Sequence, residues 1–191
     1  MKKKKEDEEE DVEHKVHEML KMSEISLILD TYDDIFSDFD PRAYFERALS
    51  VDFLEEAERA SAGKSSHFFE LNFLIPQAQR DLSKEAMIRK RLKEHFKKHF
   101  SHYEKEQRTI IRKGLGFTFL GVVLMFLAAF VFYKTRETSS LSAFLVVLFE
   151  PASWFLFWEG LNQAIFESKK IKPKVLFYKK MSQSHIHFFP Y

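Results

Sequence analysis

The segment GLGFTFLGVVLMFLAAFVFY (Gly114–Tyr133) decides the class of this protein, because it contains no charged residue. As an α-helix it would be about 30 Å long at 1.5 Å per residue, which matches the hydrocarbon core of a bilayer. A second apolar segment, Leu141–Phe166, follows a short polar turn. Two helices joined so briefly must run antiparallel. The sequence therefore predicts a transmembrane hairpin with spans at about 114–133 and 141–166.

Basic residues predict how this hairpin is oriented. Arg112 and Lys113 precede the first span, and four lysines follow the second, whereas the turn carries only Lys134 and Arg136 beside an acid. Positive charge prefers the cytoplasmic side of a membrane. We therefore expect a multi-pass protein of the cell (inner) membrane with both termini in the cytoplasm.

Small residues recur every seven positions in the first span. They are Gly114, Gly121 and Ala128, with Thr118 on the same face. Such a face lets another helix approach closely, which favours helix association in lipid. The spacing leaves open whether the second span or another subunit packs there. The expected partners are the bilayer and either a second copy or another membrane protein. The net charge of +1 gives no bulk attraction for nucleic acid.

The stretch LFEPASWFLFWEG (148–160) places Glu150 in the most apolar part of the second span, directly before Pro151. A charged acid at mid-bilayer costs about 2.5–3.5 kcal/mol on insertion scales, so it is a candidate for proton or ion handling. Two structural alternatives remain. Glu150 could donate to the carbonyl that Pro151 leaves unpaired, or it could cap a new helical segment that begins at Pro151.

Aromatic residues follow Glu150 in the same span. Trp154 and Trp158 are typical of an aromatic belt at the headgroup level. This interpretation puts Glu159 at a helix end in or just beyond the membrane interface, where a solvated carboxylate costs little.

The remaining sequence predicts a small cytoplasmic α/β domain. We expect a strand over 24–36, a helix over 50–62 with Ser50 as its N-cap and Gly63 as its stop, a strand over 66–75, a long helix capped by Ser83 that could continue into the first span, and a strand over 185–189. The last strand would return to the sheet. The expected divisions are a charged, disordered tail (1–22), the α/β domain (23–113), the hairpin (114–166) and a cytoplasmic tail that completes the domain (167–191).

Two polar clusters raise the question of metal binding. The acidic loop Asp33–Asp40 contains the candidate ligands Asp38 and Asp40, although Arg42 and Arg47 could instead pair with these acids. His95, His99 and His102 share a helix with several lysines, which favours a solvated basic face near anionic headgroups. The chain has no cysteine, which excludes disulfides and thiol catalysis. No motif specifies a reaction, so we expect no cofactor and favour a non-enzymatic protein.

Three segments carry a resemblance to other proteins. They are YDDIFSDFDPRAYFERALSVDFLEEAERA (32–60), EPASWFLFWEGL (150–161) and the closing FYKKMS and IHF. They resemble a group of small prokaryotic two-span membrane proteins to which no activity is attached. The resemblance covers most of the chain after about residue 23. It implies a membrane location and adds no functional residue.

Three functional hypotheses follow, in this order. The first is a membrane protein that anchors a small α/β domain as an oligomeric or partner-binding scaffold or sensor. The second is an oligomeric proton or ion pathway through Glu150. The third is a membrane-bound enzyme or metal-binding sensor that uses the Asp33–Asp40 loop.

Overall fold

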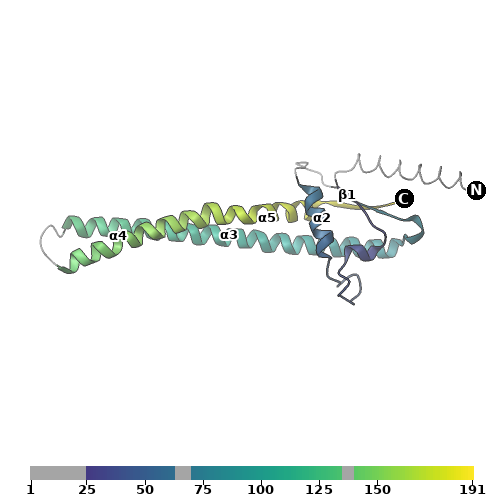
Figure 1. Ribbon diagram of the computed structural model, residues 1–191, viewed down its shortest axis with the longest axis horizontal. Helices are drawn as coiled ribbons and strands as arrows, with labels where there is room; N and C mark the ends of the chain where they lie inside the picture. The colour runs from purple at the N-terminus through teal and green to yellow at the C-terminus, as the bar shows by residue number, and fades with distance from the viewer. Residues whose placement is uncertain (1–24, 63–69, 135–139) are drawn as a thin grey trace, which may run out of the picture. The chain divides into compact units, whose positions relative to one another are not determined.

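The computed structural model describes residues 25–62, 70–134 and 140–191 (Figure 1). The chain divides into two compact units. The sheet unit comprises Met1–Phe100 with Leu176–Tyr191, and the hairpin unit comprises Ser101–Val175. Each unit has its own packing, and each is described separately.

The sheet unit contains three parallel strands in the order β1-β2-β3. They are β1 (Ile25–Ile28), β2 (Glu70–Ile75) and β3 (His185–Pro190). Ile25 lies opposite Leu71, and Leu71 lies opposite Ile186. The prediction that the C-terminal strand completes the sheet is therefore confirmed. Along β3, His185 and His187 are exposed while Ile186 and Phe188 are buried, as expected for an edge strand.

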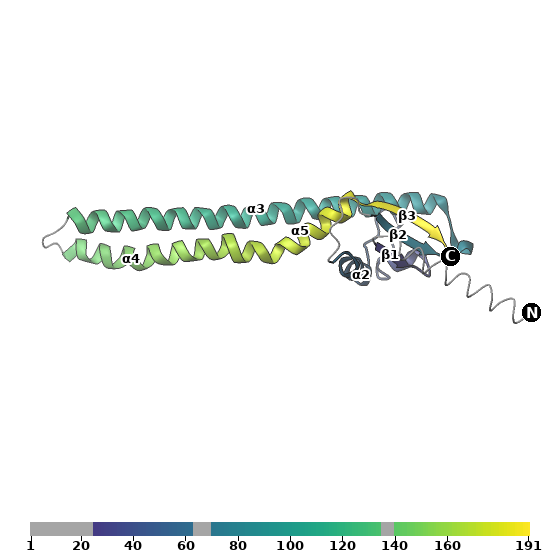
Figure 2. The ribbon, with the colours of Figure 1, turned by 90° about the horizontal axis from the view of Figure 1, so that it is seen from above.

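The core of the sheet unit forms around β2, whose last five residues are all buried. As the central strand it is flanked by β1 and β3, and Asn72 is the one polar residue among its buried positions. Phe73 lies between Phe53 and Phe188, with ring centroids 5.9 and 5.1 Å away. The helices α2 (Val51–Ser61) and α3 (Leu82–Lys134) both pack on the face of the sheet that carries Phe73 and Phe188 (Figure 2). Phe53 of α2 contacts Phe73, and Arg89 of α3 lies over the ring of Phe188. Ile88, Leu92 and Phe96 of α3 are fully buried.

The first strand of the sheet unit is shorter than expected. The strand expected over 24–36 ends at Ile28, and Tyr32–Ile35 form the 3₁₀ turn η1 instead. Thr31 and Asp34 close that turn with a capping box, which satisfies backbone groups that a longer strand would use. The helix α2 matches the prediction and has Ser50 at its N-cap position. Gly63 and residues 66–69 lie outside the described residues.

The long helix α3 continues without a break through the first apolar segment, as the sequence predicted. Its cap is Asp81, since one Asp81 carboxylate oxygen accepts the backbone N–H groups of Ser83 and Lys84 at 2.9 and 3.2 Å. The assignment of the cap to Ser83 was wrong. Behind Asp81, the buried Glu85 accepts two hydrogen bonds from Arg80 and one from the Tyr32 hydroxyl, which ties the first turn of α3 to η1.

The return helix is longer than the sequence indicated. It comprises α4 (Ser140–Leu161), the six-residue π-helix η3 (Asn162–Glu167) and α5 (Ser168–Gln183). The segment 167–191 is thus a helix for most of its length, not a tail. Because α4 passes through Pro151, the alternative that a new helical segment begins there is wrong.

Candidate functional site

The hairpin unit presents an apolar surface to its surroundings. α3 and the α4–α5 helix each contain a segment long and apolar enough to span a membrane, and only 11% of either segment is buried. Large side chains such as Phe119, Phe126, Phe132 and Phe155 are 65–73% exposed. Water would disfavour such a surface, whereas lipid is a suitable solvent for it.

The small-residue face of α3 packs against α4 of the same chain. A Cβ atom on Gly121 would lie 2.6 Å from the backbone nitrogen of Phe157, and one on Gly114 would lie 2.6 Å from that of Ala164. The sequence analysis overlooked Gly160 of α4, where a Cβ atom would lie 2.3 Å from the Thr118 nitrogen. Ala128 on the same face is 8% exposed. These contacts form a seam of small residues that joins the two helices of the hairpin. The outer faces of the helices are therefore the ones available to lipid or to another molecule.

These glycine contacts fix which residues of the two helices lie level with each other. Glu150 lies level with Phe126, only about 4 Å along the axis from the middle of the charge-free segment. Its side chain is exposed. Its backbone carbonyl accepts a 2.8 Å hydrogen bond from the Ser153 hydroxyl, whereas its carboxylate has no hydrogen-bond or ion-pair partner among the described residues. Glu150 thus faces whatever surrounds the hairpin at mid-span.

The glycine contacts also locate Trp154 and Glu159 along the hairpin. The same register puts Trp154 level with Val122, near the middle of the span, and Glu159 level with Phe117. If residues 114–133 fill the hydrocarbon core, Glu159 is about 10 Å from the midplane, inside the core half-thickness of about 15 Å. Glu159 is also not at a helix end, because the helix continues past it. Gln163 donates a 2.8 Å hydrogen bond to its carboxylate.

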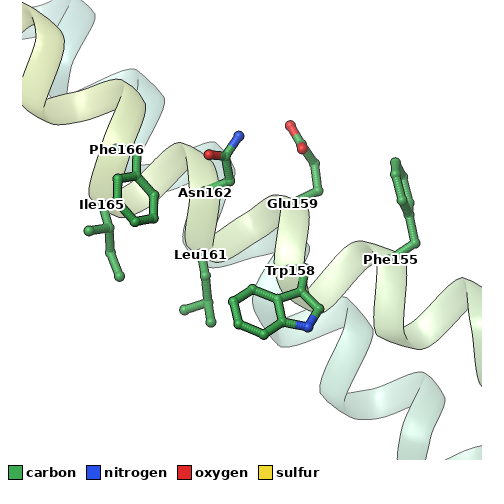
Figure 3. A pocket seen from close by; sticks show the side chains of 7 residues that line it. All are labelled: Phe155, Trp158, Glu159, Leu161, Asn162, Ile165 and Phe166. Carbon is green, nitrogen blue, oxygen red and sulfur yellow. The ribbon is translucent and has the colours of Figure 1, made fainter.

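A hollow of about 440 Å³ opens on the outer surface of α4 and η3. It is lined by Phe155, Trp158, Glu159, Leu161, Asn162, Ile165 and Phe166. In Figure 3, Glu159 and Asn162 border one side, and Trp158 and Leu161 lie on the other. The lining is mostly apolar and aromatic, with polar groups from two residues, so the hollow suits an amphipathic ligand.

The acidic loop of the sheet unit uses its carboxylates internally. Asp40 pairs with Arg42 at 2.7 Å and accepts the Ala48 backbone N–H at 2.7 Å, and these bonds hold the Asp40 pKa well below its ordinary value. Asp33 pairs with Arg47. Asp38 is 91% exposed and lies 3.9 Å from Arg47. Within the described ranges no three His, Asp or Glu side chains are grouped as metal ligands. The contacts favour a structural role for this loop.

Two histidines of the sheet unit lie in an aromatic cluster. The rings of His95 and His99 stack 4.2 Å apart, and Tyr178 stacks on His99 at 5.2 Å. Burial lowers the pKa of His95 to about 4, and the nearby charges of His99, Arg91 and Lys98 act in the same direction. The expectation of a solvated face holds for the exposed His102 but is wrong for His95 and His99, which are half-buried. Both histidines lie against Tyr178 of α5, and the sequence alone did not indicate that these two helices meet there.

Comparisons with protein-family models, with curated proteins and with solved structures found no match for this chain. The resemblance to small prokaryotic two-span membrane proteins therefore stays a prediction. Any function must be inferred from the chemistry of the two units themselves.

Proposed function

We propose that this protein is an integral membrane protein whose hairpin anchors the sheet unit at the cytoplasmic face, where the sheet unit binds a partner protein or a second copy of the chain. Two helices long and apolar enough to span a membrane support the anchoring. The excess of basic residues before the first span and after the second supports the cytoplasmic orientation of both termini.

The pairing of β2 with β3 is the observation that carries the proposal. β2 precedes both apolar helices and β3 follows both, yet the two strands pair over six residues. The segments that precede and follow the hairpin therefore belong to one folded domain. The helix α3 and the α4–α5 helix each run from the sheet unit into the hairpin unit as continuous helical segments. This arrangement suits a scaffold or sensor held close to the bilayer.

Exposed apolar side chains in the sheet unit support a partner-binding role. Phe39 is 97% exposed, and Phe45 and Val51 are 58% and 66% exposed. The loop that carries Phe39 is held by the bonds of Asp40 to Arg42 and Ala48. A phenylalanine displayed on a fixed loop loses little conformational entropy on binding and can fill a pocket on a partner.

Site-specific photocrosslinking tests this role. A photoreactive phenylalanine analogue at position 39 should give one dominant adduct in membranes, and its mass distinguishes a second copy from another protein. The matched control is the same analogue at Glu55, an exposed residue of α2. Equal labelling from both positions, or no adduct from position 39, would contradict the partner-binding proposal.

A second candidate function, proton or ion conduction, rests on Glu150. This acid is exposed near mid-span, where lipid alone would leave it unsolvated. Purified protein in liposomes should then carry a proton flux that Glu150→Gln abolishes. Glu159→Gln is the matched control, since it removes the other acid of the span. Absence of flux from correctly inserted wild-type protein would reject conduction and leave the anchor proposal standing.

A further inference from the structure

Four exposed cations of the hairpin unit form what we call the basic collar: Arg112, Lys113, Lys169 and Lys172. Two nearby acids pair with other cations, Glu104 with Arg108 at 2.9 Å and Glu167 with Lys170 at 2.6 Å. Glu106 lies 3.9 Å from His102, and Glu159 in the wall of the hollow accepts a hydrogen bond from Gln163. Within residues 101–134 and 140–175, the collar cations have no acidic partner. The collar therefore carries positive charge that the chain itself leaves unneutralised.

The collar borders the apolar part of the hairpin directly. Arg112 and Lys113 stand immediately before the charge-free segment of α3, and the register of the glycine contacts puts Arg112 level with Ala164. Lys169 and Lys172 follow within the next turns of α5. With residues 114–133 in the hydrocarbon core, Arg112 and Lys113 stand at the level of lipid phosphates. The same register puts the backbones of Lys169 and Lys172 about 10 and 15 Å beyond Gly114, from where long lysine side chains can extend back toward the phosphates.

The hollow on α4 and η3 ends where the collar begins. Ile165 and Phe166, at its outer end, precede Lys169 by only three or four residues, which is about one helical turn. Asn162 adds an amide group to its wall. The same stretch contains the π-helix Asn162–Glu167. Short π segments are uncommon and occur frequently at functional sites.

We propose that this region binds an anionic phospholipid, with the phosphate held by the basic collar and the glycerol and acyl chains lying in the hollow. Charge complementarity selects this occupant over a second copy of the chain, because two copies would bring like-charged collars together. The inference rests on the proposed anchoring of the hairpin in a membrane.

Lipid selectivity in vesicles tests the proposal and separates it from the anchoring. Full-length protein should insert into both phosphatidylcholine and mixed phosphatidylcholine–phosphatidylglycerol vesicles, as measured by flotation. Native mass spectrometry of protein released from the mixed vesicles should then show retained phosphatidylglycerol in excess over its share of the bilayer. Failure to insert into either vesicle would overturn the anchoring, whereas insertion with unselective retention would overturn only the lipid site.

Matched variants test whether the collar lysines and the hollow are responsible for the retention of phosphatidylglycerol. Lys169→Gln with Lys172→Gln should reduce the retention of phosphatidylglycerol by roughly 25-fold, since each basic residue at an anionic surface contributes roughly fivefold. Lys93→Gln with Lys97→Gln removes two exposed lysines of the sheet unit and should leave retention unchanged. Trp158→Ala should weaken retention through the hollow without changing the charge.

Three results would overturn the lipid site. The first is equal loss of retention in the two lysine double variants. The second is competition by inorganic phosphate as effective as that by the lipid, which would indicate an ion site. The third is retention that follows dimer formation, which would indicate a second copy in the hollow.

Discussion

The sheet unit and the hairpin unit use the same side chain in opposite ways. Phe36, Phe73 and Phe96 of the sheet unit are 0–2% exposed, whereas Phe119, Phe126 and Phe132 of the hairpin unit are 70–73% exposed. In water, burial of such a side chain is worth about 1.5–3 kcal/mol. In lipid this driving force is absent, and helices associate through close backbone contact. The comparison fits a chain that folds against two solvents, water around the sheet unit and lipid around the hairpin unit.

The largest expected effect on stability comes from replacing one phenylalanine of the sheet unit with alanine, and the same replacement in the hairpin unit should have almost none. Phe73→Ala should destabilise the sheet unit by about 3–5 kcal/mol, because it leaves a cavity between Phe53 and Phe188. Phe126→Ala, at a 73% exposed position, should change stability by less than about 0.5 kcal/mol. Urea unfolding of the full chain in mild detergent measures both. Similar costs at the two positions would contradict the two-solvent interpretation.

The next effect is a pH dependence confined to the sheet unit. His95 has a pKa of about 4 in the folded chain against 6.5 ordinarily, because burial disfavours its charged form. The unfolded chain therefore binds a proton between these values that the folded chain does not. The stabilisation that neutral His95 gives the folded state is therefore fully present above pH 6.5. The free energy of unfolding falls by about 2–3 kcal/mol as the pH falls toward 4.

Thermal unfolding between pH 7.5 and 4.5 measures this loss. His95→Phe should flatten the profile, while His102→Phe, which changes an exposed imidazole on the same helix, should leave it as steep as in the wild type. An equally steep profile in His95→Phe would assign the pH dependence to other groups.

A smaller effect is expected at the seam of the hairpin unit. Gly160→Ala should cost about 1–3 kcal/mol, since the new methyl group would meet the Thr118 backbone at 2.3 Å. Gly116→Ala is the matched control, because a Cβ atom there has nothing within 4 Å and alanine favours a helix by up to about 1 kcal/mol. Thermal stability in detergent distinguishes them. Equal behaviour of the two variants would contradict the packing of α3 against α4.

The sequence was sufficient for features that depend on local pattern. The charge-free segment Gly114–Tyr133 predicted part of a continuous helix, and the alternation in His185–Phe189 predicted an edge strand. The sequence was not sufficient for features that depend on which residues of α3 and α4 lie side by side. The spacing of Gly114, Gly121 and Ala128 predicted a packing face on α3. The role of Gly160 in that packing and the level of Trp154 along α3 followed only from the pairing of the two helices.

The return helix shows a second limit of sequence reasoning. Segment 168–183 was assigned to the C-terminal tail and no helix was predicted there, whereas the structure has a helix that includes Pro173. Its apolar residues Val175, Phe177 and Met181 are buried by tertiary packing. The hollow was missed for a related reason, since its lining residues follow helical spacing that also fits a simple lipid-facing surface.

Cysteine accessibility tests the central claim, that the hairpin spans a membrane with the sheet unit on the cytoplasmic side. The chain has no native cysteine, so Ser83→Cys, Ser140→Cys and His185→Cys, all at exposed positions, each give a single reporter. A membrane-impermeant maleimide should label position 140 in intact cells, and positions 83 and 185 only in inside-out vesicles. Labelling of all three positions from the same side would contradict the account.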